Sequence, residues 1–457
     1  MLEQLRHSLT NGPMEAADAQ TVFHQRRMTV AGQKVDQQFD QISEFQRFVV
    51  GVLDSGNIPA GHPEAGGDLW PWRPEVQHLA AVINDEPFVR MYAAQMMQQV
   101  PAVRRHFTSV TMLLDAINYV THTAPIFRDT SSISWQFPLS AIMNFAMMTD
   151  AGKLLMRRPQ FNDAMNEIMA AWCVYLDSPE SRYVLNEDQY GWLSPPALEY
   201  NEVLTDYVVP DRDAPYWGWK SYNDFFHRMV KMEMRPIDDP HTNETINSPN
   251  DGVAWALENF VQRDDAFWLK SQVYSMGNLL NQDPEYVNKF VGGTVYQTYV
   301  NGGADWHGFS SPINGKVTKV EMIRGYAWTE SDTVGPDPMS GPYSQGWAAG
   351  VATRGLIYID SGDSILGTVC VIPIGLTEVS SLESFVKEGQ MVKKGDVLGQ
   401  FSFGGSSFAI AFQPGAIKEI LVKPPLTGRN DQPIDTLKAN QKCAIANLAG
   451  DSEYVFD

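Results

Sequence analysis

A serine directly follows two glycines inside a strongly apolar stretch, FSFGGSSFAIAF, from Phe401 to Phe412. Apolar residues alternate with small or polar ones on both sides of the glycines, which predicts two strand segments that flank them. The Ser406 hydroxyl could attack the carbonyl of Gly405, because glycine removes side-chain hindrance and tolerates a distorted backbone. A glycine bulge or a tight hairpin explains the same local pattern. A G-x-S-x-G elbow is absent, so the sequence does not favour an α/β-hydrolase.

The elements that precede this stretch fall into two kinds, and the first kind is helical. From about Phe23 to Asp177 the apolar residues recur at helical spacing, as they do at i, i+3, i+4, i+7, i+8 and i+11 between Val89 and Val100. We expect Asn84 or Asp85 to cap that helix and Pro87 to lie in its first turn. The N-terminal part of the chain is therefore predicted to be a helical domain.

After Trp219 the pattern changes. Ser221 followed by Asp224 indicates an N-cap with an acidic first turn, so a short helix should begin there. Beyond it, short apolar runs are separated by Gly, Asn-Gly and Asp-Gly, which predicts many short strands. One run, from Thr368 to Leu376, has the length of a buried strand, and Pro373 is expected to interrupt it. We predict a compact β core, shaped as a sandwich or a partly open barrel.

Composition and charge limit the class of protein. The chain has 457 residues, 44% of them hydrophobic and 19% charged, which is typical of a folded protein with two or three domains. Its formal charge of -20 disfavours nucleic acid as a partner. The three cysteines are far apart, and the first twenty residues lack the apolar core of a secretory signal. With no candidate transmembrane segment, the sequence predicts a cytoplasmic protein without a structural metal site.

Several motifs in the second half, taken in order, resemble the phosphatidylserine decarboxylase family of self-cleaving, pyruvoyl-dependent decarboxylases. They are SYNDFFHRMVKMEMRPI (221–237), SPNDG (248–252), FVGGT followed by DWHGFSSPINGKV (290–317), VKKGDVLGQF (392–401), and FGGSS with QPGAI (403–417). A narrower resemblance is to the branch with an extra helical N-terminal domain that includes fungal L-tryptophan decarboxylases. It is carried by YGWLSPPALEY (190–200), DDAFWLKSQVYSM (264–276) and SQGWAAGVATRGLIYID (344–360).

The resemblance implies an α+β fold: a helical N-terminal domain, residues 1–200, followed by a mainly antiparallel β decarboxylase core of short strands, residues 201–457. It also implies that Ser406 attacks Gly405 and that the chain breaks there into a β chain, 1–405, and an α chain, 406–457. Ser406 would become a pyruvoyl group. That covalent cofactor condenses with a substrate amine and takes up the electrons left by CO₂ loss, so neither a metal nor pyridoxal phosphate is expected.

The family's site residues map onto this sequence with one departure. Asp251 in SPNDG matches the Asp that orients a His during maturation, although a turn-capping role explains the same residue. The family pattern D-Y-H-x-x-H reads D-W-H-G-F-S here, so His307 matches the first His, a proton carrier in decarboxylation, and Ser310 replaces the second, the maturation base. His307 could also serve that missing role. Ser407 could assist the elimination or hydrogen-bond its strand. Arg354 could pair with a substrate carboxylate or an internal acid.

Three functions follow from the resemblance. The narrower branch points to a small aromatic amino acid, with L-tryptophan converted to tryptamine, and the acidic chain shows no basic anchor for a lipid surface. The alternative is phosphatidylserine decarboxylation. A second alternative is an uncleaved, inactive member that acts as a binding protein, because the chain lacks the family's second His. The stretch 386–399 also resembles half-motifs of biotinyl or lipoyl carrier domains, although without their modifiable lysine. The β and α chains would stay together, and an oligomer is compatible with all three functions.

Overall fold

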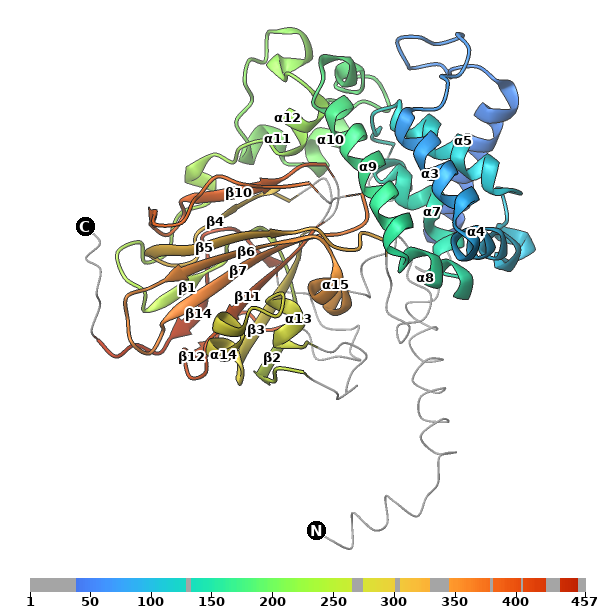
Figure 1. The fold of residues 1–457 in the computed structure, drawn as a ribbon. Helices are drawn as coiled ribbons and strands as arrows, with labels where there is room; N and C mark the ends of the chain where they lie inside the picture. Colours follow the sequence, from blue (N-terminus) through green and yellow to red (C-terminus); the bar gives the residue numbers. More distant parts are fainter. Residues whose placement is uncertain are drawn as a thin grey trace, which may run out of the picture.

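The computed structural model describes residues 38–128, 133–264, 274–300, 305–328, 345–378, 381–403, 406–424 and 436–450. Helices gather on one side of the molecule and a large, curled β-sheet occupies the other (Figure 1). The predicted α+β class, with helices first and a mainly antiparallel β core after them, is confirmed.

The helical region is built from helices of different lengths, several of which begin with a proline. Residues 38–55 are helical. The helices that follow are α3 (Pro74–Asp85), α4 (Pro87–Gln99), α5 (Val110–Thr121), α6 (Ile133–Gln136), α7 (Pro138–Met147), α8 (Asp150–Met156), α9 (Pro159–Leu176), α10 (Pro195–Tyr200), α11 (Val203–Asp206) and α12 (Tyr222–Phe226).

Helix α4 tests the periodicity argument directly. Its predicted apolar face is confirmed, since Val89, Ala93, Met96 and Met97 are all buried. The predicted cap is wrong: the helix begins at Pro87, and the side chain of the preceding residue, Glu86, accepts a hydrogen bond from the Val89 amide. Asn84 and Asp85, which were predicted to cap α4, are instead the last residues of α3. The connection between the two helices is therefore too short for a separate Asn or Asp cap.

The β part contains short strands and three further helices. The strands are β1 (Thr245–Asn247), β2 (Gly252–Val261), β3 (Gly293–Val300), β4 (Gly308–Ser310), β5 (Gly315–Ile323), β6 (Arg354–Asp360), β7 (Thr368–Gly375), β8 (Leu382–Ser384), β9 (Met391–Val392), β10 (Val397–Phe401), β11 (Ser406–Phe412), β12 (Ile417–Ile420), β13 (Thr436–Leu437) and β14 (Lys442–Ala446). The helices are α13 (Met276–Leu279), α14 (Pro284–Phe290) and α15 (Gln345–Val351).

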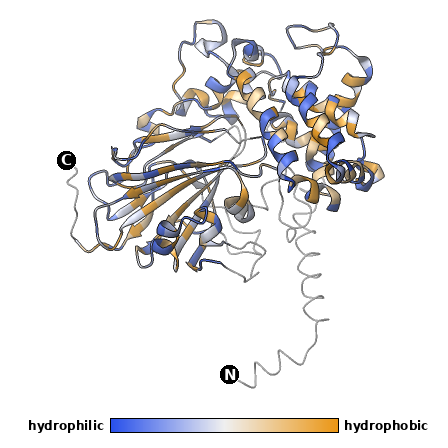
Figure 2. Ribbon diagram, viewed as in Figure 1, coloured by the Kyte–Doolittle hydropathy of each residue, from blue (hydrophilic) through white to orange (hydrophobic). Residues whose placement is uncertain are grey.

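The strands form one eight-stranded sheet, in the order β13-β2-β3-β11-β7-β6-β5-β9, and two three-stranded sheets, β1-β14-β12 and β4-β10-β8. All pairings within the described chain are antiparallel. Apolar residues alternate along the strands, and one face of the large sheet packs against α13, α14 and α15 (Figures 1 and 2). Strand β11 lies inside the sheet, with β3 on one side and β7 on the other.

Two predictions about the β part have different outcomes. The expected N-cap is confirmed, because the Ser221 side chain accepts from the Asp224 amide at the start of α12. The interruption at Pro373 is wrong, since β7 continues through it. The β6–β7 ladder has a gap between the pairs Ile357↔Val371 and Arg354↔Ile374, so the missing N–H of the proline falls where no ladder bond is made.

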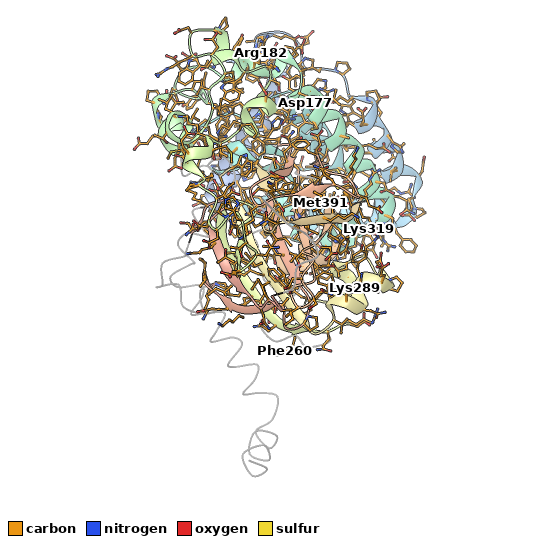
Figure 3. All side chains as sticks on the ribbon, turned by 90° about the vertical axis from the view of Figure 1, so that its left-hand side faces the viewer. Asp177, Arg182, Phe260, Lys289, Lys319 and Met391 are labelled. Atoms are coloured by element: carbon orange, nitrogen blue, oxygen red, sulfur yellow. The ribbon has the colours of Figure 1, made fainter. Side chains whose placement is uncertain are left out.

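The helical region and the sheet share a core. The apolar cluster of the helices also includes Phe226 of α12, Trp328 and Phe403, which belong to the β half of the sequence. In Figure 3, Asp177 and Arg182 mark the helical region, and Lys289 of α14 and Phe260 of β2 mark the opposite end of the molecule. Because Phe403 directly precedes the Gly-Gly-Ser-Ser segment, the helices contact the polypeptide next to the predicted cleavage point.

Gly399 of β10 provides a test of how tightly the small sheet is packed. A Cβ at this residue would lie 2.1 Å from the carbonyl oxygen of Glu383 and 2.5 Å from Cζ of Phe309. We expect Gly399→Ala to lower the free energy of unfolding by about 1–3 kcal/mol, because the neighbouring backbone would have to move. Urea denaturation would measure this, with Gly51→Ala as the control, since nothing lies within 4 Å of that helical Cβ. Equal stability of the two variants would contradict the packing argument.

Candidate active site

Ser406 is the first residue of β11. It pairs with Val300 of β3 on one side and with Gly375 of β7 on the other. Gly405 and the Ser406 side chain lie outside the described residues. The backbone position alone shows that residue 406 is held in the middle of the large sheet, immediately after the predicted cleavage point.

The next serine, Ser407, is fully buried. Its hydroxyl accepts a hydrogen bond of 2.6 Å from Nε2 of Gln297 and donates one of 3.2 Å to the Thr298 carbonyl. The Gln297 amide oxygen in turn accepts from the Tyr274 hydroxyl. The Ser407 hydroxyl is therefore fixed by the neighbouring strand.

His307 lies beside the strand that leads to the glycines. Its carbonyl accepts a 2.7 Å hydrogen bond from the amide of Phe401, the last residue of β10. Its ring is buried and packs on the Phe226 ring, with 4.0 Å between centroids and an interplanar angle of 40°. The histidine therefore lies at the contact between the small sheet and the helical region.

Phe403 is surrounded by rings from the helical region. Its centroid lies 5.1 Å from Trp172, 5.3 Å from Phe226, 5.4 Å from Tyr222 and 6.1 Å from Phe137. We call these five residues the Phe403 cluster. Its members come from four separate places in the chain, since Tyr222 and Phe226 share α12. The polypeptide before the cleavage point is therefore fixed by tertiary packing rather than by the local sequence.

Asp251 lies in a buried ion-pair network. The Arg235 guanidinium donates to both of its carboxylate oxygens, at 2.9 and 2.6 Å, and also to Asp206 at 2.6 Å. The Asp251 carboxylate further accepts from the backbone amides of Trp306, at 3.3 Å, and Ala439, at 2.8 Å. Burial by itself lowers the pKa of Arg235, but the two carboxylates outweigh it and raise that pKa above its usual value.

Ser310 belongs to the same network. Its hydroxyl hydrogen-bonds to Oδ1 of Asn440 at 2.9 Å and to the Pro249 carbonyl at 3.3 Å. The Asn440 amide also donates to the carbonyl of Arg235. Through these bonds Ser310 and Asp251 are brought together, and Asp251 contacts the residue next to His307.

Arg354 pairs with Ile374 in the large sheet, so its backbone lies close to β11. Its guanidinium turns away to the carbonyls of Asn278 and Leu279 at the end of α13, at 2.6 and 3.0 Å, and to that of Ala352. Burial lowers the pKa of Arg354 to about 10. These contacts are those of a residue that joins α13 to the sheet.

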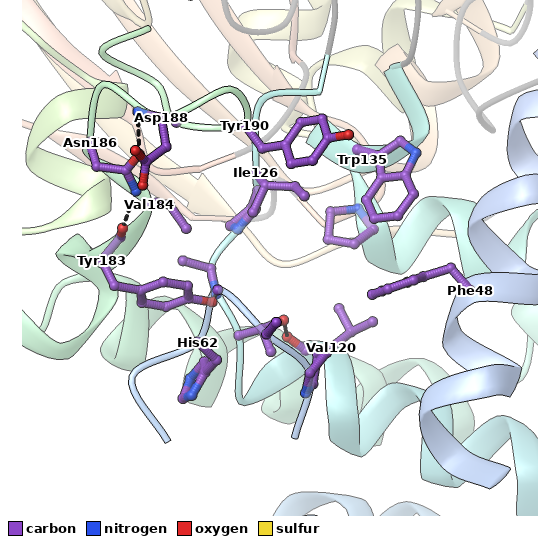
Figure 4. A pocket seen from close by; sticks show the side chains of 18 of the residues that line it. Phe48, His62, Val120, Ile126, Trp135, Tyr183, Val184, Asn186, Asp188 and Tyr190 are labelled. Carbon is purple, nitrogen blue, oxygen red and sulfur yellow. Dashed lines mark hydrogen bonds between the residues drawn. The ribbon is translucent and has the colours of Figure 1, made fainter. Parts of the chain in front are cut away.

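A separate cavity of about 460 Å³ lies within the helical region. Figure 4 shows Phe48, Trp135, Tyr183 and Tyr190 around it, with His62 at one side. All of its lining residues fall between 45 and 191, and neither residue that pairs with Ser406 is among them. No group of His, Cys, Asp and Glu that could hold a metal ion occurs among the described residues.

Comparison with known proteins now decides the family. Two family models, both described as phosphatidylserine decarboxylase, match residues 73–200 and 222–428. Decarboxylase iboD of Amanita muscaria is 35% identical over 297 residues, which are 61% of this chain and 84% of that protein. The chain belongs to the phosphatidylserine decarboxylase family.

Other relatives carry names of two kinds. An L-tryptophan decarboxylase of Psilocybe cubensis is 30% identical over 391 residues, which are 80% of this chain and 86% of that protein. A phosphatidylserine decarboxylase proenzyme of Fusobacterium nucleatum is 27% identical over 221 residues, which are 47% of this chain and 65% of that protein. The family and these named decarboxylases indicate that the chain is a carboxy-lyase. Within the described part of the chain, no helix has the length and apolarity needed to span a membrane.

The backbone fits the family's covalent pyruvoyl group. A chain that began at residue 406 would still be held by β3 and β7, because both ladders start at that residue. Three further residues were not predicted from the sequence: Arg235, Gln297 and Glu378. Glu378 is buried beside the Phe403 cluster. Arg235 lies in the motif at 221–237 and Glu378 follows β7, but sequence alone does not show that their charges are buried.

The buried ion pairs of Arg235 make a testable prediction. Arg235→Met would leave the Asp251 and Asp206 carboxylates without their guanidinium partner, so we expect the free energy of unfolding to fall by about 3–5 kcal/mol. Urea unfolding followed by tryptophan fluorescence would measure the loss. Arg90→Met, at an exposed arginine, should change stability by less than about 0.5 kcal/mol. An unchanged Arg235→Met midpoint would show that the network contributes little.

Proposed function

We propose that this chain cleaves itself before Ser406 and uses the resulting pyruvoyl group to decarboxylate an aromatic amino acid, with L-tryptophan as the preferred substrate. The carrying observation is the position of residue 406 at the start of β11, where a new chain end would remain fixed between two strands. The pyruvoyl ketone supplies an electrophile for the substrate amine and an acceptor for the electrons left when CO₂ departs. The protein residues supply positioning and proton transfer.

His307 is the proposed proton carrier of the decarboxylation step. It is buried and rests on Phe226, beside the strand that ends at Phe401. Asp251 is a positioning residue in this proposal, because it accepts a hydrogen bond from the amide of Trp306 and so fixes the backbone next to the histidine. Because water is largely excluded here, the electrostatic interactions of His307 and the hydrogen bond to Asp251 are stronger than they would be at the surface.

The preference for an aromatic substrate has two supports. The relatives of Psilocybe are named L-tryptophan decarboxylases, and the aromatic rings of the Phe403 cluster pack close to the chain that leads to residue 406. Aromatic rings favour a flat aromatic side chain over a lipid headgroup. The formal charge of -20 also disfavours an anionic membrane surface.

The proposal keeps the domain division at residues 1–200 and 201–457 and the two chains 1–405 and 406–457. The chains would remain associated, since Asp251 and Ser310 of the first chain bond to Ala439 and Asn440 of the second. A cytoplasmic location suits the three free cysteines.

Self-cleavage can be read directly from mass. Intact-mass analysis of the purified protein should give one fragment that ends at Gly405 and a second that begins at residue 406 with a pyruvoyl terminus. Ser406→Ala should remain a single chain, because the attacking hydroxyl is gone, whereas Ser402→Ala should still cleave. Two fragments from Ser406→Ala would show that the nucleophile is another residue, and an uncleaved wild type that a hydrazine does not label would favour the inactive binding protein.

Substrate choice requires a second measurement. Phosphatidylserine stays the second candidate because both family models carry that name. We expect CO₂ release from L-tryptophan to exceed that from tyrosine and phenylalanine, with no release from phosphatidylserine vesicles. Each substrate would be assayed on the same cleaved preparation, with uncleaved Ser406→Ala as the blank. Release from the vesicles alone would reverse the assignment.

A further inference from the structure

The cavity of the helical region has the size of a small-molecule site. Its volume of about 460 Å³ falls within the range of about 300–1,000 Å³ that is typical of ligand pockets. Two of its lining residues, Tyr190 and Phe48, are 45% and 37% exposed, so rings at its edge can be reached from solvent. Because protein interiors are close-packed, a space of this size that solvent can reach is a candidate binding site.

Aromatic rings line two sides of the cavity. In Figure 4, Trp135 and Phe48 lie on one side, and Tyr183 and His62 lie on the other. The Trp135 ring centroid is 4.9 Å from that of Phe48, and the Tyr183 centroid is 4.8 Å from that of His62. Most of the remaining lining residues are apolar. Walls of this kind favour a ligand that contains a flat aromatic ring.

One of these walls is fixed by hydrogen bonds and ring contacts with its neighbours. The Tyr183 hydroxyl accepts a hydrogen bond of 3.0 Å from the Ala124 amide. The loop that carries His62 is fastened by Trp70, whose Nε1 donates to Glu64 at 2.8 Å and whose ring centroid lies 5.0 Å from that of His62. A ligand would therefore find this wall already formed, which lowers the entropic cost of binding.

The charge of the lining selects among aromatic ligands. Among the described residues that line the cavity, Asp188 is the single carboxylate, and none is a lysine or an arginine. Asp188 is exposed, and the ion pairs of the described residues do not include it. Burial lowers the pKa of His62, so its ring is uncharged near neutral pH. The cavity therefore favours a cationic group over an anionic one.

The guanidinium of Arg128 lies close to the cavity but is not part of its lining. It covers the Trp135 ring, with 4.5 Å between the guanidinium carbon and the ring centroid, and it pairs with the Glu44 carboxylate at 2.8 Å. Because Glu44 offsets its charge, this arginine does not turn the cavity into a site for anions.

We propose that this cavity binds an arylalkylamine, a flat aromatic ring that a short chain joins to a cationic amine. The ring lies between Trp135 and Tyr183, and the ammonium group faces the Asp188 carboxylate. An aromatic amino acid binds more weakly, because its carboxylate meets no positive partner in the lining. Amines of this class are also the products of the proposed decarboxylation, but the binding site itself does not depend on that reaction.

Isothermal titration calorimetry of the full-length protein with tryptamine tests the proposal. Tryptophol, in which a hydroxyl replaces the amine, and indole-3-propionate, in which a carboxylate does, should bind roughly 2- to 5-fold more weakly or worse. Tryptamine binding should weaken as salt is added, because a charge pair near the surface is screened. Ser406→Ala, which has no pyruvoyl group, should bind tryptamine as tightly as the wild type does.

Two variants locate the binding in the cavity. Asp188→Asn should remove the preference for tryptamine over tryptophol, whereas Asp85→Asn, at an exposed aspartate outside the lining, should keep it. Ile126→Trp places a large ring in the cavity and should weaken tryptamine binding at least about tenfold. Val103→Trp is its matched control, since Val103 is 81% exposed and does not line the cavity. Urea denaturation would show whether both tryptophan variants are folded.

The contrary outcomes are distinct. If only the cleaved wild type binds tryptamine, the amine lies at the pyruvoyl group and the cavity is not its site. If Asp188→Asn keeps the preference for tryptamine, or folded Ile126→Trp binds it as the wild type does, the inference is wrong. Should Ile126→Trp fail to fold, Asp188→Asn decides alone. A chain that never cleaves but binds tryptamine in the cavity would defeat the proposed function and support this inference.

Discussion

The central position of β11 is the constraint on which the proposed chemistry depends. Its pairing with β3 and β7 begins at residue 406, so the backbone is ordered by two ladders on one side of the predicted break. On the other side, Phe403 is held by the rings of the helical region, and its amide donates to the Asn223 side chain. The chain is thus fixed by tertiary contacts at Phe403 and by the sheet at residue 406.

The helical region thus has a role at the site itself. The Asn223 side chain also bonds to Asp177 at the end of α9, so the chain before the glycines is tied to helices by hydrogen bonds as well as by rings. Glu378 makes the reverse connection, from the sheet to α7. These links cross the proposed domain boundary, and they join the parts of the chain that the two family models match.

The features that were predicted correctly from the sequence are those that depend on residues close together in the chain. Periodicity found α4 and the Ser221 cap, because apolar spacing and a side-chain cap act over a few residues. The predicted interruption of the strand at Pro373 was wrong, because a gap in the neighbouring β6–β7 ladder accommodates the proline. The family motifs located Asp251, but its partner Arg235 became evident only in the fold, since burial of a charge depends on residues distant in sequence.

The same limit applies to Glu378. In the sequence it follows β7 as an ordinary glutamate, and most glutamates are exposed. Its burial comes from the turn at Thr377 and from the amides at the start of α7, which lies 238 residues earlier in the chain. In the same way, Ser310 is connected to the Asp251 network through Asn440, which lies 130 residues later in the chain and cannot be identified as its partner from the motif.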